Sequence, residues 1–239
     1  MILTILAFAY VVLATVFVSL IGIAAMVFYL LGLRKLAKQI IYWVERFWSM
    51  SIIKVVGFKV TVTGREKIPK EGGVCFVSNH SGYFDIVLLL AYCGRLIGFI
   101  AKKELAYVPL LNIWIYMIGG LFIDRKSVKK ASRTINKGVE KIKSGGCMIV
   151  FPEGHRSKDG ALLPFHPGSL KLATMAEAPI VPVVLQGSYE VFEKNRRVVR
   201  HPVKVTFCDP IETAGLPPTD KKVVLCDRIY SVIKEQLEI

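Results

Sequence analysis

The sequence reads Gly73-Val-Cys-Phe-Val-Ser-Asn-His-Ser-Gly-Tyr-Phe-Asp85, and then Ile-Val-Leu-Leu-Leu, where an apolar run meets a polar turn. The apolar run that ends at Ser78 predicts a buried strand, and the run after Asp85 predicts a helix. The residues between them, Asn79 to Gly82, form a polar turn at the carboxyl end of the predicted strand. Open α/β sheets bind ligands at that edge, so this stretch predicts both the fold class and a candidate site.

Further short β-rich runs alternate with helical patterns along the rest of the chain. Strands are expected near Phe58–Thr63, Gly73–Ser78, Leu96–Ala101, Cys147–Phe151, Ile180–Gln186 and Val203–Cys208. Helices are expected near Asp85–Cys93, Ser127–Lys143 and Ser169–Ala176, with a closing helix in the tail from Thr219. This alternation predicts an α/β domain over residues 57–239, with a mixed, largely parallel sheet flanked by helices.

The composition excludes several classes of protein. Of the 239 residues 53% are hydrophobic, and 32 Lys plus Arg against 18 Asp plus Glu give a net charge of +14. The low charged fraction excludes a disordered chain, and five scattered Cys without a Cys-x-x-Cys pair exclude a disulfide scaffold. The four His fit no metal-binding spacing, so neither a metal nor a cofactor is expected. An apolar yet basic chain points to a membrane surface.

The N-terminal segment, Met1 to Leu33, contains no charged residue. As a helix it would reach about 50 Å, whereas the hydrocarbon core of a bilayer measures about 30 Å. A signal peptide needs an early basic region and a shorter apolar run, so a retained membrane helix is favoured. Arg34, Lys35 and Lys38 follow directly, which places the remaining chain on the cytoplasmic face of an inner or plasma membrane.

The next segment, Leu36 to Val56, has the pattern of an amphipathic helix. Its polar face is expected to carry Lys38, Tyr42, Glu45 or Arg46, and Ser49, with Leu36, Ile40, Trp43, Val44, Phe47, Met50 and Ile53 on the remainder. A helix packed on a soluble core is the alternative, but the neighbouring apolar segment favours a place at the headgroup boundary. Residues 1–56 are therefore expected to form a membrane-embedded helical pair.

His80 is the side chain in the polar turn best suited to proton abstraction near neutral pH. Asp85 lies five residues later, and Gly82 between them can bend the chain so that the carboxylate returns to the imidazole. Such a pair fixes the tautomer of the histidine and stabilises its protonated form. From spacing alone, the alternative remains a polar turn in which Asp85 only favours its helix N-terminus.

Motifs in a fixed order make the chain resemble the PlsC-type 1-acyl-sn-glycerol-3-phosphate acyltransferases, the lysophosphatidic acid acyltransferase family. Asn79-His80-x-x-x-x-Asp85 resembles the family's H-x4-D motif. The further motifs are Gly119-Gly-Leu-Phe-Ile-Asp-Arg125, Phe151-Pro-Glu-Gly-His-Arg-Ser157 and Val181-Pro-Val183. The resemblance covers roughly residues 55–210 and favours the catalytic interpretation of the turn.

The resemblance implies transfer of a fatty acyl group from a thioester to the sn-2 hydroxyl of 1-acyl-glycerol-3-phosphate, giving phosphatidic acid. His80 would accept the hydroxyl proton and Asp85 would orient it, without a covalent acyl-enzyme. Backbone N–H groups from Ser81 to Phe84 are candidates for stabilising the oxyanion. The resemblance places Arg125 and Arg156 at the acceptor's phosphate, with Glu153 and Gly154 shaping that pocket. Lys102 is a further cation there, and its neighbour Lys103 is the alternative.

Two departures from the family pattern affect the expected acceptor. His155 replaces a threonine, and Phe165-His-Pro-Gly168 lacks a customary cation for which His166 or Lys171 are possible substitutes. Another lysophospholipid or a glycerol phosphate is therefore the alternative acceptor, and a silent membrane-anchored lipid-binding module is the alternative class.

The predicted helix over Ser127–Lys143 has a basic face. Three interpretations of this face remain open: a solvated surface, a contact for anionic membrane phospholipid, or a docking face for an acidic acyl-carrier protein. The acyl donor is expected to be either an acyl-carrier protein thioester or acyl-coenzyme A. The apolar leader argues against a nucleic-acid partner.

Overall fold

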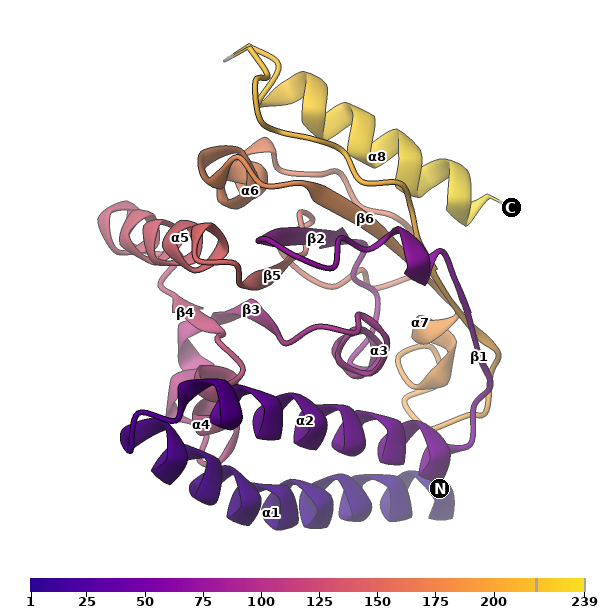
Figure 1. The fold of residues 1–239 in the computed structure, drawn as a ribbon. Coiled ribbons are helices and arrows are strands. Elements are labelled where there is room, and N and C mark those ends of the chain that lie inside the picture. The colour runs from indigo at the N-terminus through magenta and orange to yellow at the C-terminus, as the bar shows by residue number, and fades with distance from the viewer. Residues whose placement is uncertain (218, 239) are drawn as a thin grey trace.

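The computed structural model describes residues 1–217 and 219–238, and a seven-stranded sheet lies at its centre (Figure 1). Its strands are β1 (Val60–Thr63), β2 (Val74–Ser78), β3 (Ile97–Lys102), β4 (Leu121–Ile123), β5 (Cys147–Val150), β6 (Ile180–Gln186) and β7 (Val203–Phe207). The spatial order is β1-β7-β6-β2-β5-β3-β4. Only β6 and β7 pair antiparallel, so the sheet is mixed and largely parallel, as the sequence predicts.

The parallel pairing brings the carboxyl ends of β2, β3, β4, β5 and β6 to one edge of the sheet. The connections that leave these ends contain the polar turn after Ser78 and the predicted motifs. Because β2 lies between β6 and β5, the polar turn stands in the middle of this edge. Segments far apart in the sequence therefore meet at one place.

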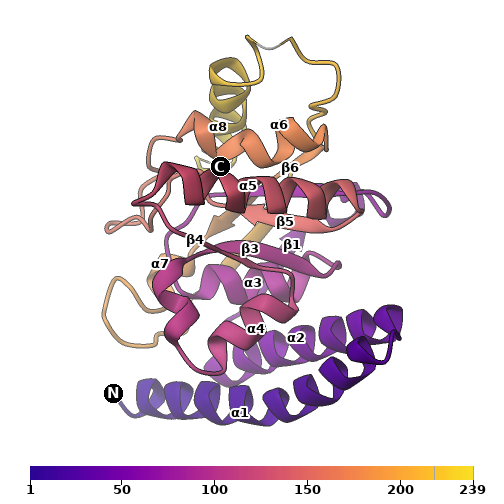
Figure 2. The same ribbon diagram turned by 90° about the vertical axis from the view of Figure 1, so that its left-hand side faces the viewer.

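Helices cover both faces of the sheet (Figures 1 and 2). They are α1 (Ile2–Leu30), α2 (Arg34–Val56), α3 (Phe84–Tyr92), α4 (Leu111–Met117), α5 (Val128–Lys143), α6 (Lys171–Ala176), α7 (Ser188–Val191) and α8 (Val223–Leu237). Strand β2 is buried throughout, and its alternate side chains enter two cores. Val74 and Phe76 pack with residues of α2 and α3, whereas Cys75 and Val77 pack with residues of α5, α6 and α8. This two-sided burial explains the continuous apolar pattern of the strand.

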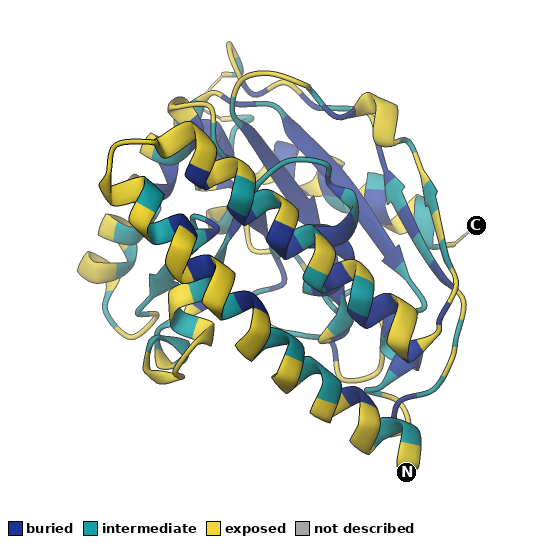
Figure 3. Ribbon diagram, turned by 60° about the horizontal axis from the view of Figure 1, so that its bottom comes forward, coloured by how far each residue is buried: buried dark blue, intermediate teal, exposed yellow. Residues whose placement is uncertain are grey.

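The two N-terminal helices run side by side along one end of the domain (Figures 1 and 2). Hydrogen bonds tie α1 to the rest of the protein along its length: Trp48 Nε1 donates to Thr15 Oγ1 at 3.1 Å, and Trp114 Nε1 donates to Ser19 Oγ at 2.9 Å. Helix α1 is long and apolar enough to cross a membrane by length and composition. Its outward residues include Ile2, Leu6, Leu13, Phe17 and Leu20, all more than half exposed (Figure 3). An exposed apolar face of this extent indicates membrane association.

The orientation of α2 corrects part of the sequence expectation. Glu45 and Ser49, placed on the polar face, are buried, while Trp43 and Phe47 point outward with 63% and 60% of their surface exposed. The helix packs between α1 and α3, so the fit of its side chains against these two helices, as well as their polarity, decides which of them are buried. The carboxylate oxygens of Glu45 have no hydrogen-bond partner among the described residues. Tertiary packing here overrides the amphipathic pattern.

The short elements are the ones that the sequence does not reveal. Strand β4 has three residues at the edge of the sheet, and α4 and α7 have seven and four residues. None is long enough to show a period. The longer helix α5 begins as expected, because Ser127 caps it by accepting a hydrogen bond from Lys130 N at 3.4 Å.

Candidate active site

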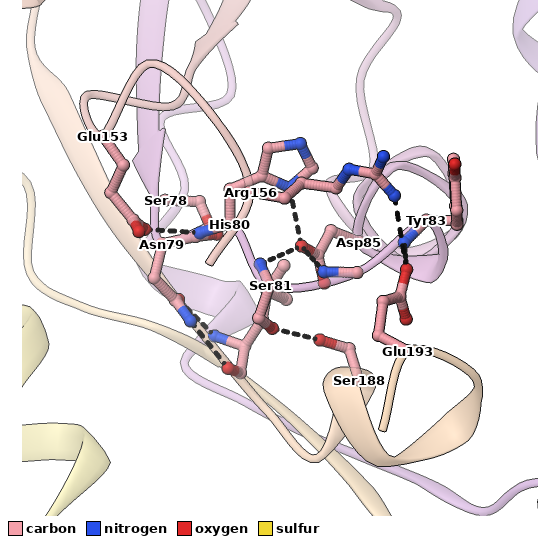
Figure 4. Close-up of polar contacts among 12 residues, drawn as sticks. Ser78, Asn79, His80, Ser81, Tyr83, Asp85, Glu153, Arg156, Ser188 and Glu193 are labelled. Carbon is pink, nitrogen blue, oxygen red and sulfur yellow. Dashed lines mark hydrogen bonds and ion pairs between the residues drawn. The ribbon is translucent and has the colours of Figure 1, made fainter. Parts of the chain in front are cut away.

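The polar turn after β2 folds back so that His80 and Asp85 meet (Figure 4). His80 Nδ1 lies 2.7 Å from Asp85 Oδ2. The Asp85 side chain is fully buried, whereas 17% of the His80 side chain is exposed. His80 also lines a large cavity of about 1840 Å³. The aspartate thus holds one ring nitrogen, and the other nitrogen is left for a reacting group, an arrangement suited to general-base chemistry.

Backbone groups fix the carboxylate of Asp85 in this position. Its Oδ2 atom accepts hydrogen bonds from Ser81 N at 2.7 Å and from Gly82 N at 2.8 Å, in addition to the contact with His80. The buried Oδ1 atom has no partner among the described residues. The turn is therefore built around one carboxylate oxygen.

The segment after β5 supports the histidine from the other side. The Phe151 ring stacks on the imidazole with a centroid distance of 4.0 Å. Glu153 Oε1 accepts a hydrogen bond from His80 N at 2.6 Å, and Ser157 N donates to His80 O at 2.9 Å. These contacts hold both the ring and the backbone of His80, which explains why the two motifs occur together.

Glu153 lies behind the wall of the cavity, next to the backbone of His80. It is buried, it does not line the cavity, and its other oxygen accepts a hydrogen bond from Leu163 N at 3.2 Å. Burial raises the pKa of Glu153 to about 7, against the two backbone hydrogen bonds, which favour the charged form. Glu153 shapes the site by holding the backbone of His80.

The predicted cations gather around the cavity that contains His80. Lys102, Arg125 and Arg156 line it; Lys102 ends β3, Arg125 follows β4 and Arg156 follows β5. His166 and Lys171, the candidate substitutes for the missing motif cation, line it too. Of the residues that the sequence predicts for the site, His80, Lys102, Arg125, Gly154 and Arg156 line this one cavity, whereas Asp85 and Glu153 are buried behind its wall.

The structure separates the neighbouring lysines 102 and 103. Lys103 Nζ pairs with Asp124 Oδ2 at 2.9 Å, and this ion pair raises the pKa of Lys103. Lys102 lines the cavity with 66% of its side chain exposed, and its nearest carboxylate oxygen, on Glu104, is 3.7 Å away. Lys102 is therefore the cation available to a ligand, and Lys103 secures the segment before Arg125.

A close approach of three segments forms the wall beside Arg125. The Arg125 guanidinium donates to the backbone carbonyl of Gly154, which has a φ of +77° that favours glycine. A Cβ atom at this glycine would lie 3.4 Å from His166 Cδ2. The backbone of His166 donates to Pro152 O at 2.9 Å. The altered Phe165–Gly168 stretch thus packs directly against Pro152 and Gly154, the motif residues just before Arg156.

Sequence reasoning missed Glu193, which lies just after α7 (Figure 4). Its Oε1 atom accepts a hydrogen bond from Tyr83 N at 2.6 Å and lies 3.4 Å from Arg156 Nη1. The guanidinium of Arg156 also stacks over the Tyr83 ring at 3.7 Å. A lone glutamate in a charged segment carries no sequence signal, because only the fold brings it to the turn.

The backbone N–H groups considered for an oxyanion already have acceptors. Ser81 N and Gly82 N donate to Asp85, and Tyr83 N donates to Glu193. The sequence expectation is wrong for these three groups. They stabilise the turn, so an oxyanion formed here needs a different donor.

Known proteins with similar sequences identify the family of this chain. The model of the family described as "Acyltransferase" matches residues 59–186. The chain is 32% identical over 188 residues to 1-acyl-sn-glycerol-3-phosphate acyltransferase alpha from Homo sapiens, covering 77% of this chain and 65% of that protein. It is 34% identical over 209 residues to 1-acyl-sn-glycerol-3-phosphate acyltransferase from Saccharomyces cerevisiae, covering 81% of this chain and 64% of that protein. The chain thus spans slightly less than two thirds of the length of these relatives.

A solved structure extends the similarity to nearly the whole fold. The 1-acyl-sn-glycerophosphate (LPA) acyltransferase PlsC from Thermotoga maritima superposes with a TM-score of 0.84 at 28% identity. The match covers 98% of this chain and 95% of that one, so it includes the N-terminal helices.

Proposed function

This chain belongs to the acyltransferase family, and on that premise we propose that it acylates the sn-2 hydroxyl of 1-acyl-glycerol-3-phosphate, which gives phosphatidic acid. The observation that most directly supports this proposal is the 2.7 Å contact between His80 Nδ1 and Asp85 Oδ2. It lies at the edge of a cavity that Lys102, Arg125 and Arg156 also line. A base and several cations on one cavity suit an acceptor that bears both a hydroxyl and a phosphate. The relatives' names support the same acceptor.

The reaction proceeds by direct transfer between the two substrates. His80 takes the proton of the acceptor hydroxyl as its oxygen attacks the thioester carbonyl, and Asp85 stabilises the imidazolium that forms. The C–S bond then breaks, and the thiolate takes the proton from His80. A new ester and a free thiol result, and the histidine returns to its neutral form. The side chain of His80 thus carries one proton from the acceptor hydroxyl to the leaving thiolate.

The donor's carrier is proposed to approach along α5 and α6. The cavity that contains His80 is also lined by Ile135 of α5, by Met175 of α6, and by Lys171, Lys221 and Lys222. An apolar stretch ending in lysines suits a long acyl thioester with an anionic carrier. Both an acidic acyl-carrier protein and the phosphates of coenzyme A fit this chemistry, and a direct assay separates them.

The proposed function is tested by assaying the purified protein in detergent with both thioesters. Lysophosphatidic acid, glycerol 3-phosphate and a neutral lysolipid serve as acceptors. We expect transfer to lysophosphatidic acid at a rate at least about tenfold higher than to the neutral acceptor, because a neutral headgroup forms no ion pairs with the cations that line the cavity. Preferred transfer to another acceptor would keep the mechanism and implicate Phe165–Gly168. A folded protein that transfers to none of them would be the lipid-binding module instead.

The helical pair α1 and α2 is proposed to lie in the membrane surface with its exposed apolar face toward the lipid. Helix α1 contacts the domain along its length, so it lies beside the domain, and its outward side chains form one continuous face (Figure 3). The basic residues Arg34, Lys35 and Lys38 at the turn between the helices suit anionic headgroups. We place the catalytic domain on the cytoplasmic face of an inner or plasma membrane. Membrane phospholipid is then a partner, and nucleic acid is not.

Replacing the outward aromatic residues of α2 tests this membrane face. The double variant Trp43→Ser, Phe47→Ser should bind anionic phospholipid vesicles at least about tenfold more weakly, because each aromatic side chain loses about 1.5–3 kcal/mol of apolar burial. Vesicle flotation measures the effect. Val223→Ser, Val224→Ser is the matched control, since these valines are equally exposed on α8 at the opposite end of the molecule (Figure 1). Equal loss of binding in both double variants would contradict the proposed face.

A further inference from the structure

The carboxylate of Glu193 stands between the catalytic turn and Arg156, and the mechanism above does not use it (Figure 4). Only 12% of the side chain is exposed. One oxygen, Oε1, receives Tyr83 N at 2.6 Å and faces Arg156 Nη1 at 3.4 Å. The other, Oε2, is buried without a partner among the described residues and lies 2.9 Å from where a Cβ atom would stand on Gly82. Glycine at position 82 makes room for this carboxylate.

The segment that carries Glu193 is firmly anchored. Val199 N donates to Val191 O at 2.8 Å and closes the segment into a loop. The Phe192 ring packs edge-on against both Tyr83 and Phe8 of α1, with centroid distances of 6.1 and 5.5 Å. A side chain that begins from an anchored backbone and accepts a short backbone hydrogen bond has a defined position. Glu193 is therefore part of the site's architecture.

Arg156 is held from two sides in this arrangement. Its guanidinium lies over the Tyr83 ring at 3.7 Å and against the Glu193 carboxylate. The arginine is thus oriented toward the cavity before any phosphate is present, and its charge is offset by an anion. A phosphate that binds Arg156 must replace this anion or share the guanidinium with it.

We propose that Glu193 is a positioning residue that orients Arg156 over Tyr83 and that is exchanged for the phosphate of the acceptor. The inference rests on the proposed function and deepens it. Its physical consequence is weaker phosphate binding, because the carboxylate competes for Arg156 and repels the incoming anion. That effect is useful in a site whose product keeps the same phosphate, since tight uniform binding of substrate and product does not raise kcat.

Two substitutions separate the charge of Glu193 from its hydrogen bond. In Glu193→Gln the amide oxygen can still accept from Tyr83 N, but the negative charge is gone. We expect its KM for lysophosphatidic acid to fall about fivefold with kcat nearly unchanged, a size typical of one partly exposed ion pair. In Glu193→Ala the Tyr83 N–H loses its acceptor, so kcat should fall about tenfold. Mildly alkaline buffer keeps the wild-type carboxylate charged, because burial raises the pKa of Glu193.

Further measurements exclude a merely structural effect. Because electrostatic repulsion scales with the charge of the ligand, Glu193→Gln should improve the inhibition constant of a phosphate monoester more than that of lysophosphatidylglycerol, a diester. In an Arg156→Ala background, Glu193→Gln should lower KM by a clearly smaller factor, because the competition for Arg156 is gone and only the direct repulsion remains. Glu190→Gln is the matched control, since Glu190 pairs with Lys194 at 3.0 Å in the same segment and does not line the cavity.

The outcomes distinguish this inference from the proposed function. A KM that rises or stays constant in Glu193→Gln, or a fall of undiminished size without Arg156, overturns the role of Glu193 while leaving acylation intact. Calorimetric titration with an alkyl phosphate in detergent micelles provides a readout that needs no turnover. If the wild-type protein transfers no acyl group and yet binds the alkyl phosphate more weakly than Glu193→Gln does, the exchange stands and the proposed function fails.

Discussion

The variant His80→Ala should lose acyl transfer by about three orders of magnitude in kcat, within the usual range for removal of a general base. The imidazole is the group next to Asp85 that can take the acceptor's proton, and it lines the cavity. The KM for lysophosphatidic acid should change little, because the cations that would hold its phosphate are on other strands. Steady-state kinetics with a saturating thioester measures both parameters.

Two companion variants make this result specific. His80→Gln keeps a polar side chain against the Phe151 ring, which the imidazole contacts at 4.0 Å, so a loss of activity there is not explained by a packing void. His201→Ala removes a histidine beside Pro202, outside the cavity, and should retain wild-type kcat. A kcat of His80→Ala within tenfold of the wild-type value would contradict the general-base role of His80.

The second large effect is expected for Asp85→Asn, which should lower kcat about 10²- to 10⁴-fold. The asparagine oxygen can replace Oδ2 and accept from Ser81 N and Gly82 N, whose hydrogen bonds measure 2.7 and 2.8 Å. Its amide nitrogen then takes the place of Oδ1, which has no partner among the described residues. The turn is kept, and the charge that stabilises the imidazolium is lost. Kinetics and a thermal unfolding curve of the same preparation separate the two effects.

The comparison with Asp85→Ala completes this test. Alanine leaves the buried N–H groups of Ser81 and Gly82 without an acceptor, which costs about 1–3 kcal/mol of unfolding free energy for each. We therefore expect Asp85→Ala to melt at a lower temperature than Asp85→Asn, although both are inactive. An Asp85→Asn variant with nearly full activity would show that the carboxylate serves the turn alone, which is the alternative that spacing leaves open.

The sequence by itself predicts most of the architecture. The apolar runs of β2 and β6 are long and continuous because both faces of these strands are buried, and α5 has both a periodic face and a capping Ser127. Burial and periodicity are local properties, so they are visible along the chain. The strand β4 and helices α4 and α7 are too short to carry a pattern, and their formation depends on the elements that they contact.

The site divides in the same way. His80, Asp85, Arg125 and Arg156 stand in sequence motifs, and Lys102 stands at the end of a predicted strand. The fold brings these segments to one edge of the sheet. The contacts that each of these residues makes within the folded site are not visible in the sequence. The motif does not reveal that Glu153 is buried and accepts a hydrogen bond from the backbone of His80. The sequence likewise does not reveal that Lys103 forms an ion pair with Asp124.

The sequence determined the class of fold, the carboxyl-end position of the polar turn and the chemistry of the groups in it. The tertiary structure alone decided which face of α2 is buried, which lysine is available, and that Glu193, 110 residues after Tyr83, reaches the turn. The physical reason is the range of the interactions. Apolar runs, side-chain periods and helix caps are set within a few residues and are visible along the chain, whereas charge pairing and the burial of one helix face depend on groups that only the folded chain brings into contact.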